Sequence, residues 1–427
     1  MIDLQQAQQT QALCVLLVIQ CVVSFRSVPR ILRTIFGQSG SSSGYWIPHF
    51  TSVINWTYRF GLGLLRQVTP ITTPWVAIID HTIDIGTKKA LVVLRVPLDA
   101  LKRRQSAIRL EDCECIGLTV SEKVNGESLL VDLTAIFKQA GSPGAIIKDG
   151  DATLNKGVRL WTQTQAALIP IIADIGHAMA IALKKQFASD VLFQRFTGIT
   201  NRIAKRFRQT DLAFLIPPKL RSKGRFQSVS KLANWAGKIL AMMSNQERVK
   251  KGSVLARLGK ALSGLALLKP FITHFIQTTQ VVTGINEILK NKGLTQASYA
   301  QCAELCATLP SESTTRHQVN EWLQQHLAIQ QKFPDVPLLV SSDIIESLFG
   351  NYKHIIERSP QADMNRSVLL IPALCGKRDN TTILNALHHV SHQELNTWEQ
   401  TNIPYTVRKK RRGFFDVKSS QKKVVNL

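Results

Sequence analysis

Residues Trp75–Asp80 read WVAIID and residues Ala90–Val96 read ALVVLRV, and these two stretches decide the fold. Both are short apolar runs rich in β-branched residues, a pattern that is typical of buried strands. Two more apolar runs are GAIIKD at Gly144–Asp149 and AALIPIIAD at Ala166–Asp174. Three of the four runs end in an acid, the first of them in Asp80. Because a charge at a strand end costs desolvation unless it is exposed or binds something, these acids predict a polar site at a sheet edge.

The elements around these runs predict a single mixed sheet. We expect a third strand at 113–120 and helices at Ser128–Ala140, Thr153–Thr164 and His177–Phe187. The chain order is then three strands, helix, strand, helix, strand and helix, which is the order of a ribonuclease H-like fold. We therefore predict an α/β protein with a ribonuclease H-like mixed five-stranded sheet, although many α/β folds share simple alternation.

The start of the chain, residues 1–70, is predicted to be helical. Its helices should span Leu13–Ser24, Val28–Phe36 and Pro48–Leu65. This arrangement is compatible with a helix-turn-helix DNA-binding segment. It is also compatible with a plain helical cap on the next domain, which the long loop between the last two helices favours.

The predicted domains follow from these changes of pattern. The first part of the ribonuclease H-like core spans 71–187, and a large, basic, all-α insertion spans 188–335. The core returns over 336–404 with a capped helix inside Val340–Lys353. The remaining residues, 405–427, form a basic tail that contains the run RKKRR and is predicted to be disordered.

The chain is strongly basic, with 53 Lys and Arg residues against 29 Asp and Glu, a net charge of +24 and a pI of about 10. The excess is local: residues 178–270 hold 19 basic and 3 acidic residues, and the tail holds 8 and 1. Such an excess indicates a polyanion partner, most simply nucleic acid. Hydrophobic residues make up 44% of the chain, which excludes a mainly disordered or fibrous protein.

Cysteine usage and hydropathy indicate a reducing cytosol. The seven cysteines are scattered and form no C-x-x-C pair, so neither a zinc ribbon nor a disulfide framework is expected. The apolar stretch Ala12–Phe25 is shorter than the roughly 20 residues that a membrane helix needs, and it lacks the basic start of a signal peptide. We therefore expect no membrane partner and a cytoplasmic, nucleoid-associated protein.

Asp80 and Asp149 are the acids best placed to act together. If the first and fourth strands are neighbours, as in a ribonuclease H arrangement, their carboxylates face one another and repel. Bound Mg²⁺ relieves this repulsion, since it prefers oxygen ligands. Glu346, on a helix that returns to the sheet, is a candidate third ligand of a two-metal site. Alternatively each acid only caps the following helix, and Asp151 competes with Asp149 as the second ligand.

Four segments of the sequence together resemble bacterial insertion-sequence transposases of the DDE class. They are IIDHTIDIGTKKALVVL at 78–94, IIKDGDATLNKG at 146–157, ADIGHAMAIALK at 173–184 and SSDIIESLFGNYK at 341–353. The resemblance runs from about residue 24 to about residue 375, with Asp on the first strand, Asp after the fourth and Glu on a later helix. It implies that Asp80, Asp149 and Glu346 are catalytic and hold two Mg²⁺ or Mn²⁺ ions.

The same resemblance gives supporting roles to a histidine and a lysine. Asp174 and His177 form a D-x-x-H pair that looks like the motif following the second Asp in the hAT and Mutator-like superfamilies. His177 would orient a strand or reach a phosphate, with Asp174 in support, or else is a hydrogen-bonded core histidine. Lys353, two helical turns after Glu346, resembles an E-x6-K element that contacts DNA phosphate, or else is a surface lysine. The arginine expected four residues before the Glu is replaced by Ser342.

The basic region is expected to follow a DNA backbone through electrostatic, sequence-independent contacts. The candidate contacts are Lys184, Lys185, Arg206, Arg208, Arg221, Lys223 and Arg225. The resemblance implies a transposase that hydrolyses a phosphodiester at the transposon end and joins the freed 3′-hydroxyl to target DNA. It would act on double-stranded DNA as a homodimer or larger synaptic complex. The alternatives are a non-enzymatic DNA-binding protein derived from such an enzyme, and a ribonuclease H-like nuclease that cuts without joining.

Overall fold

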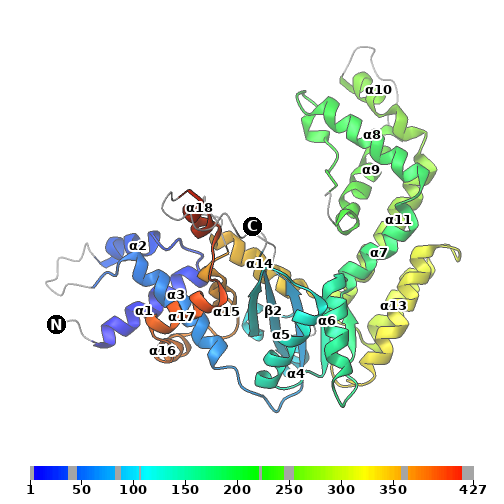
Figure 1. Ribbon diagram of the computed structural model, residues 1–427. Coiled ribbons are helices and arrows are strands. Elements are labelled where there is room, and N and C mark those ends of the chain that lie inside the picture. The colour runs from blue at the N-terminus through cyan, green and yellow to red at the C-terminus, as the bar shows by residue number, and fades with distance from the viewer. Residues whose placement is uncertain are drawn as a thin grey trace. The chain divides into compact units, whose positions relative to one another are not determined.

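The structure is a computed structural model of the full chain. The residues it describes are 4–36, 46–81, 88–104, 107–220, 224–244, 254–356 and 364–415. The chain forms two compact units, which Figure 1 shows coloured by residue number. Unit 1 comprises residues 1–104, 108–172 and 342–427, and unit 2 comprises residues 105–107 and 173–341. Most of unit 2 is therefore inserted in the sequence between the second and third parts of unit 1.

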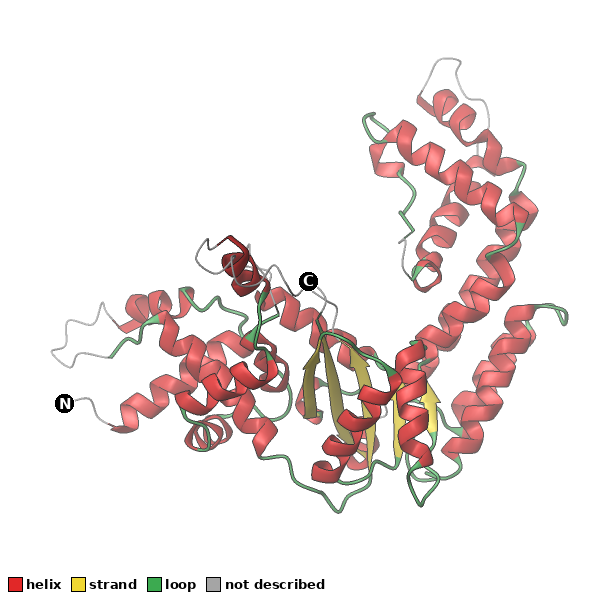
Figure 2. Cartoon of the chain, viewed as in Figure 1, coloured by secondary structure: helices red, strands yellow, loops and turns green. Residues whose placement is uncertain are grey.

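Unit 1 is built around one mixed sheet, whose described strands number five. They are β1 (Trp75–His81), β2 (Lys89–Pro97), β3 (Glu114–Ser121), β4 (Ala145–Lys148) and β5 (Ile171–Ala173). Their order across the sheet is β3-β2-β1-β4-β5 (Figure 2). The pairs β1–β2 and β2–β3 are antiparallel, and β1–β4 is parallel. This is the ribonuclease H-like arrangement, so the predicted fold class is confirmed.

One face of the sheet packs against α5 (Gly126–Ala140) and α6 (Ala152–Gln163). Alternate residues of β1 share a buried cluster with both helices. The cluster includes Trp75, Ala77 and Ile79 from β1, Leu129, Leu133 and Phe137 from α5, and Leu154, Val158 and Trp161 from α6. Since side chains alternate along a strand, the even-numbered residues of β1 point to the opposite face.

The opposite face is contacted by two helices from the C-terminal part of unit 1. These are α14 (Asp343–Ile356), which contacts β1, and α15 (Leu370–Ala373), which contacts β3. The buried side of α14 has helical spacing and consists of Ile345, Leu348, Phe349, Tyr352 and Ile355. The predicted capped helix inside Val340–Lys353 is thus confirmed, and it continues three residues beyond Lys353.

Helices from both ends of the chain pack together in unit 1. They are α1 (Leu4–Ile19), α2 (Ser27–Phe36), α3 (Phe50–Arg66), α16 (Asn380–His388) and α17 (His392–Asn402). Arg59 of α3 donates hydrogen bonds to the carbonyls of Leu387 and Val390, near the end of α16. Within α3 only Thr51 and Arg66 are exposed, so α3 does not present the free face that a recognition helix needs. This packing favours the plain helical cap over the helix-turn-helix.

Unit 2 is helical throughout most of its described part. Its helices are α7 (Ile175–Phe187), α8 (Val191–Phe207), α9 (Val229–Ser244), α10 (Val254–Ala266), α11 (Lys269–Lys292), α12 (Gln296–Ala307) and α13 (Thr314–Gln330). Its core contains mutually packed rings of Phe187, Phe193, Phe196, Phe271 and Phe275. The predicted helical character of the insertion is confirmed, and the compact unit begins at Ala173, before the predicted start at 188.

Three predicted elements differ from the structure. The strand expected over Ala166–Asp174 is only β5, because residues 166–168 are exposed and Pro170 has no N–H to donate. The first helix, expected over Leu13–Ser24, is α1 and ends five residues earlier. The tail is expected to be disordered from residue 405, but Val407–Phe415 form α18, and the residues after it lie outside the described ranges.

The remaining elements are short. They are α4 (Leu98–Arg104) and the single-turn helices η1 (Leu110–Asp112), η2 (Ala213–Leu215), η3 (Arg225–Gln227) and η4 (Arg366–Leu369). In the part of the chain that the structure describes, none of the helices combines the length and the apolar character needed to cross a membrane.

Candidate active site

Asp80 and Asp149 leave the sheet side by side. Strands β1 and β4 are parallel, with Ile79 opposite Lys148, and the two acids are the next residues in each strand direction. Neighbouring strands lie roughly 4.8 Å apart, so the two residues start from adjacent positions at one edge of the sheet. Asp80 is an even-numbered residue of β1 and therefore points to the α14 face.

Glu346 lies in the first turn of α14, the helix that contacts β1. The pKa of Asp80 is raised from its ordinary 3.8 to about 7, chiefly by burial and next by the charge of Asp149. The charges of Glu346 and Asp151 raise it further, whereas the backbone N–H of His81, which donates to Asp80 Oδ1 at 2.7 Å, opposes the shift. Because Coulomb interactions fall with distance, this coupling indicates that Asp149 and Glu346 are both charged neighbours of Asp80.

Asp151 and Asp149 have different local roles. Asp151 is the N-cap of α6, and its Oδ1 accepts the N–H groups of Thr153 at 2.9 Å and Leu154 at 3.0 Å. Asp149 lies outside this cap, and its Oδ1 accepts the N–H of Asp151 at 2.9 Å. The capping alternative therefore describes Asp151, and the geometry favours Asp149 of the two as a metal ligand.

The donor set fits divalent metal ions in chemistry but does not form a closed ligand cage. Asp80, Asp149 and Glu346 offer the carboxylate oxygens that Mg²⁺ and Mn²⁺ prefer. Within the described residues, however, no three His, Cys, Asp or Glu side chains are grouped closely enough to hold a metal ion. Asp80, Asp149 and Glu346 are the residues that would hold the ions.

Lys353 lies two turns after Glu346 on α14, and its side chain is half-buried. Residues seven apart on a helix face the same side, so the lysine is on the side of the carboxylate. The carbonyl of Ser342 accepts the N–H groups of Ile345 at 2.9 Å and Glu346 at 3.4 Å at the start of the helix. Ser342 therefore takes part in the start of the helix through its backbone carbonyl. Lys353 is the cation that α14 places on the side of Glu346.

Asp174 and His177 belong to unit 2, at the start of α7. Asp174 is 6% exposed and caps this helix, since its Oδ1 accepts the N–H of His177 at 2.7 Å. The D-x-x-H spacing is therefore that of an N-cap and the third helical residue. The ring of His177 is half-buried, and its contact with DNA stays a prediction.

His326 of α13 is a supporting residue that the sequence patterns did not reveal. Its Nε2 accepts the N–H of Ala173 at 3.0 Å, and its Nδ1 donates to the carbonyl of Trp322 at 2.7 Å. The ring also stacks on Trp322, with centroids 4.0 Å apart. Burial lowers the pKa of His326 to about 4, so the ring is neutral and holds the residue directly before Asp174. The available signal was a tryptophan and a histidine four residues apart on one helix face.

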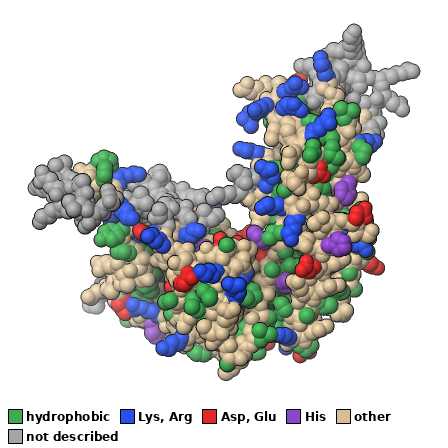
Figure 3. All heavy atoms as spheres, turned by 45° about the vertical axis from the view of Figure 1, so that its right-hand side comes forward, with side chains coloured by type: hydrophobic (Ala, Val, Ile, Leu, Met, Phe, Trp, Pro, Cys, Tyr) green, Lys and Arg blue, Asp and Glu red, His purple; other side chains and the backbone are tan. Residues whose placement is uncertain are grey.

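Lys and Arg side chains gather along one edge of unit 2 (Figure 3). Five of the predicted DNA contacts are described, and all five are exposed: Lys184 and Lys185 in α7, Arg206 in α8, Arg208 directly after it, and Arg225 in η3. The other two, Arg221 and Lys223, lie outside the described residues. The exposed cations are thus accessible to a polyanion, as the prediction requires.

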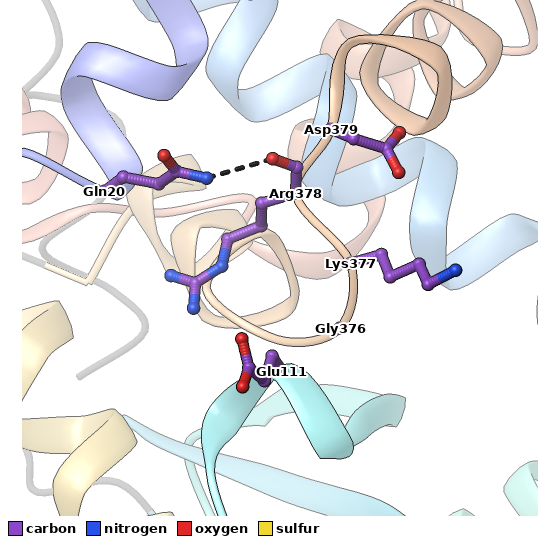
Figure 4. A pocket seen from close by; sticks show the side chains of 6 residues that line it. All are labelled: Gln20, Glu111, Gly376, Lys377, Arg378 and Asp379. Carbon is purple, nitrogen blue, oxygen red and sulfur yellow. Dashed lines mark hydrogen bonds between the residues drawn. The ribbon is translucent and has the colours of Figure 1, made fainter.

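Unit 1 also contains a polar pocket of about 490 Å³. It is lined by Gln20, Glu111, Gly376, Lys377, Arg378 and Asp379, and Figure 4 shows the Gln20 side chain donating to the Arg378 carbonyl at 2.9 Å. Its lining mixes acids and cations and includes none of the predicted site residues. The pocket therefore adds nothing to the candidate active site.

Comparison with known proteins supplies a structural neighbour. The chain matches no protein-family model, and no curated protein matches it. Among solved structures, the Drosophila P element transposase strand transfer complex is similar at 12% identity and a TM-score of 0.42, covering 92% of this chain and 94% of that chain. A likeness at this level carries no argument about activity, so the fold assignment rests on strand order and register.

Proposed function

We propose that the chain is a DDE-class DNA transposase of the insertion-sequence kind. It hydrolyses a phosphodiester at the transposon end and transfers the freed 3′-hydroxyl to target DNA. Asp80, Asp149 and Glu346 are its catalytic residues and hold two Mg²⁺ or Mn²⁺ ions. The observation that carries the proposal is the parallel pairing of β1 with β4, which sets Asp80 beside Asp149, together with the contact of α14, the helix of Glu346, with β1.

This crowding of like charge has no evident structural purpose. A carboxylate that only stabilises a fold is held by cations or backbone donors, as Asp151 is. Asp80 accepts the N–H of His81, but the charged neighbours that shift its pKa are all acids. Strongly perturbed acids at the end of a strand are typical of functional sites, and a bound cation removes the repulsion.

The chemistry needs no energy-rich cofactor, because phosphodiester bonds are conserved in the joining step. Water first attacks phosphorus, and the bond to the 3′ oxygen breaks, which frees a 3′-hydroxyl and leaves a 5′-phosphate. That hydroxyl then attacks a phosphodiester of the target and replaces its 3′ oxygen. Asp80, Asp149 and Glu346 would hold the divalent ions, which would supply an activated nucleophile and stabilise the leaving oxygen. Lys353 holds a neighbouring backbone phosphate, and the work of the three acids is to hold and orient the ions.

The proposed partner is double-stranded DNA, as transposon ends and target. The exposed cations of unit 2 support it, since they suit a phosphate backbone. Because two transposon ends must be cut and joined together, the acting species is proposed to be a homodimer or a larger synaptic complex.

The test is strand cleavage of a duplex that carries the flanking inverted repeats, in Mg²⁺ or Mn²⁺. The variants D80N, D149N and E346Q should each abolish cleavage, because each removes a charged ligand, while their affinity for the duplex stays within a few-fold. The matched control is D151N, since asparagine caps a helix as well as aspartate does. It should still cleave. Cleavage by any of the first three variants would contradict the ligand assignment.

A second candidate is a non-enzymatic DNA-binding protein. The observation that favours it is the set of exposed cations on unit 2, which suit a phosphate backbone whether or not the chain cuts it. It predicts that the wild-type chain binds the duplex in Mg²⁺ and Mn²⁺ without cutting it. Cutting without joining would instead identify the nuclease alternative.

A further inference from the structure

The C-terminal helix α18 carries five consecutive cations, Arg408–Arg412. All five side chains are exposed. Successive residues of a helix are about 100° apart, so five in a row surround the helix and present positive charge in every direction. Clustered Lys and Arg on one short element form the electrostatic footprint of a polyanion-binding surface.

The structure holds this helix in place against unit 1. Thr406, 8% exposed, caps the first turn with its hydroxyl. The Nζ of Lys88 donates to the carbonyl of Tyr405, directly before the cap. Lys410 forms an ion pair with Glu122 at 3.1 Å. These three contacts distinguish α18 from a freely solvated basic arm.

The anchors of α18 lie at the sheet edge that bears the candidate carboxylates. Lys88 precedes β2, and Glu122 follows β3. Because β2 is antiparallel to β1, with Leu91 opposite His81, the start of β2 lies beyond the end of β1. The end of β3 lies next to the start of β2. Counting strand spacings and residue rises puts the anchors roughly 14 to 17 Å from Asp80, the length of about four to five base pairs.

We propose that α18 is a DNA-binding element that grips the phosphate backbone a few base pairs from the candidate catalytic carboxylates. The proposal rests on the proposed function, to which it adds the surface that holds the substrate near the site. The carboxylates alone repel a phosphate backbone, whereas the cations of α18 attract it. A duplex seated on α18 therefore lies within reach of Asp80.

An exposed aromatic pair ends the same helix. Phe414 and Phe415 are 72% and 73% exposed, and their rings lie edge to face with centroids 5.2 Å apart. Aromatic rings beside cations stack on bases or wedge between base steps, and a cut or distorted end offers such surfaces. A basic helix with phenylalanines also suits an anionic membrane. The anchoring of α18 at the carboxylate edge favours DNA.

The test compares two charge-matched variants of the full chain. The α18 variant is R408Q/K409Q/R411Q/R412Q, which keeps the ion pair of Lys410 with Glu122. The control variant removes the same charge from exposed residues of α4, α5 and α6, as K102Q/R103Q/K138Q/R159Q. Affinity for a random duplex of roughly 30 base pairs is measured by fluorescence anisotropy between about 50 and 200 mM KCl. Thermal unfolding of each variant checks that the fold is kept.

If the α18 variant loses two phosphate contacts, the magnitude of its slope of log affinity against log salt concentration should fall by about 1.8. Its binding to the duplex at about 0.1 M KCl should weaken by roughly 60-fold. The control should change both quantities by much less. Equal changes in the two variants would overturn the proposal, because they would reflect net charge alone. Unchanged DNA binding together with lost binding to phosphatidylserine vesicles would overturn it in favour of a membrane. Either result would leave the cleavage test of Asp80, Asp149 and Glu346 unaffected, so the two proposals fail separately.

Discussion

Replacing Asp80 by asparagine should stabilise the metal-free protein while it abolishes the proposed activity. The Asp80 carboxylate is buried, and its charged neighbours are acids, so ionising it works against folding. Asparagine has nearly the same shape and removes the charge. Its Oδ1 can still accept the N–H of His81, which Asp80 accepts at 2.7 Å. The substitution therefore removes the repulsion and keeps the hydrogen bond.

The magnitude follows from the pKa of Asp80, which rises from 3.8 to about 7 on folding. Each tenfold change in the acid dissociation constant corresponds to about 1.36 kcal/mol, so the full rise corresponds to about 4 kcal/mol. Movement of the neighbouring side chains lowers this energy. We therefore expect D80N to raise the free energy of unfolding by about 2 to 4 kcal/mol above pH 7. The pKa of Asp80 is higher in the folded state than in the unfolded state. The contribution of the protonated carboxyl to the free energy of unfolding is therefore complete below about pH 4 and is lost as the pH rises through 7. The advantage of D80N should grow over the same range.

The assay is urea unfolding in EDTA at several pH values between about 4.5 and 8, with D99N as the control. Asp99 is exposed in the first turn of α4, at the other edge of the sheet, so D99N should give no gain. Added Mg²⁺ should stabilise the wild type and have less effect on D80N. If D80N were no more stable than the wild type above pH 7, or if its advantage did not change with pH, the inferred crowding of Asp80 would be wrong.

Two further predictions concern the fold. Burial lowers the pKa of His326 to about 4. The contribution of the neutral ring to the free energy of unfolding is therefore present above about pH 6.5 and is lost as the pH falls toward 4. When the pH falls from about 7.5 to 5, the free energy of unfolding should drop by about 2 kcal/mol less in H326Q than in the wild type. If the two proteins showed the same pH dependence, the assignment of a buried neutral ring would be wrong. A Cβ on Gly61 would lie 1.9 Å from the Leu369 carbonyl oxygen, so G61A should cost about 3 kcal/mol or more in urea unfolding. In contrast, G198A, with nothing within 4 Å of the added carbon, should be neutral or stabilise by up to about 1 kcal/mol.

The sheet could be predicted from the sequence because its strands are apolar runs with acids at their ends. Trp75–Asp80 lies in β1, and Asp149 directly follows β4. These positions are local properties, and the parallel pairing of the two strands follows from the ribonuclease H-like order. What the sequence did not show is how close Glu346 comes to the two aspartates, because this depends on how α14 packs against β1.

The partners of the N-terminal helices could not be predicted. Arg59 lies on the third helix of the predicted helix-turn-helix segment, but its guanidinium donates hydrogen bonds to the carbonyls of Leu387 and Val390. Nothing local to Arg59 indicates a partner more than 300 residues away in the chain. The helix-turn-helix interpretation relied on helix order alone, and order does not say which face is buried.

The order in the tail was missed for a different reason. A run of like charges is typical of disorder, and RKKRR at Arg408–Arg412 fits that pattern. Lys and Arg are nevertheless good helix formers, and Thr406 supplies a cap at the required spacing. The two anchors, Lys88 and Glu122, come from distant strands. The cap was visible in the sequence, but the anchors were not.

The acids and the cations of unit 1 have opposite electrostatic effects on a DNA phosphate. An edge with Asp80, Asp149 and Glu346 repels the phosphate that a transposase must bring to it. In the proposed function, divalent ions would remove that repulsion at the site, and the cations of α18 would offset it a few base pairs away. Each bound DNA phosphate also favours the ions, since it supplies further oxygen ligands. Linkage requires this effect to be reciprocal, so the factor by which DNA raises metal affinity equals the factor by which metal raises DNA affinity.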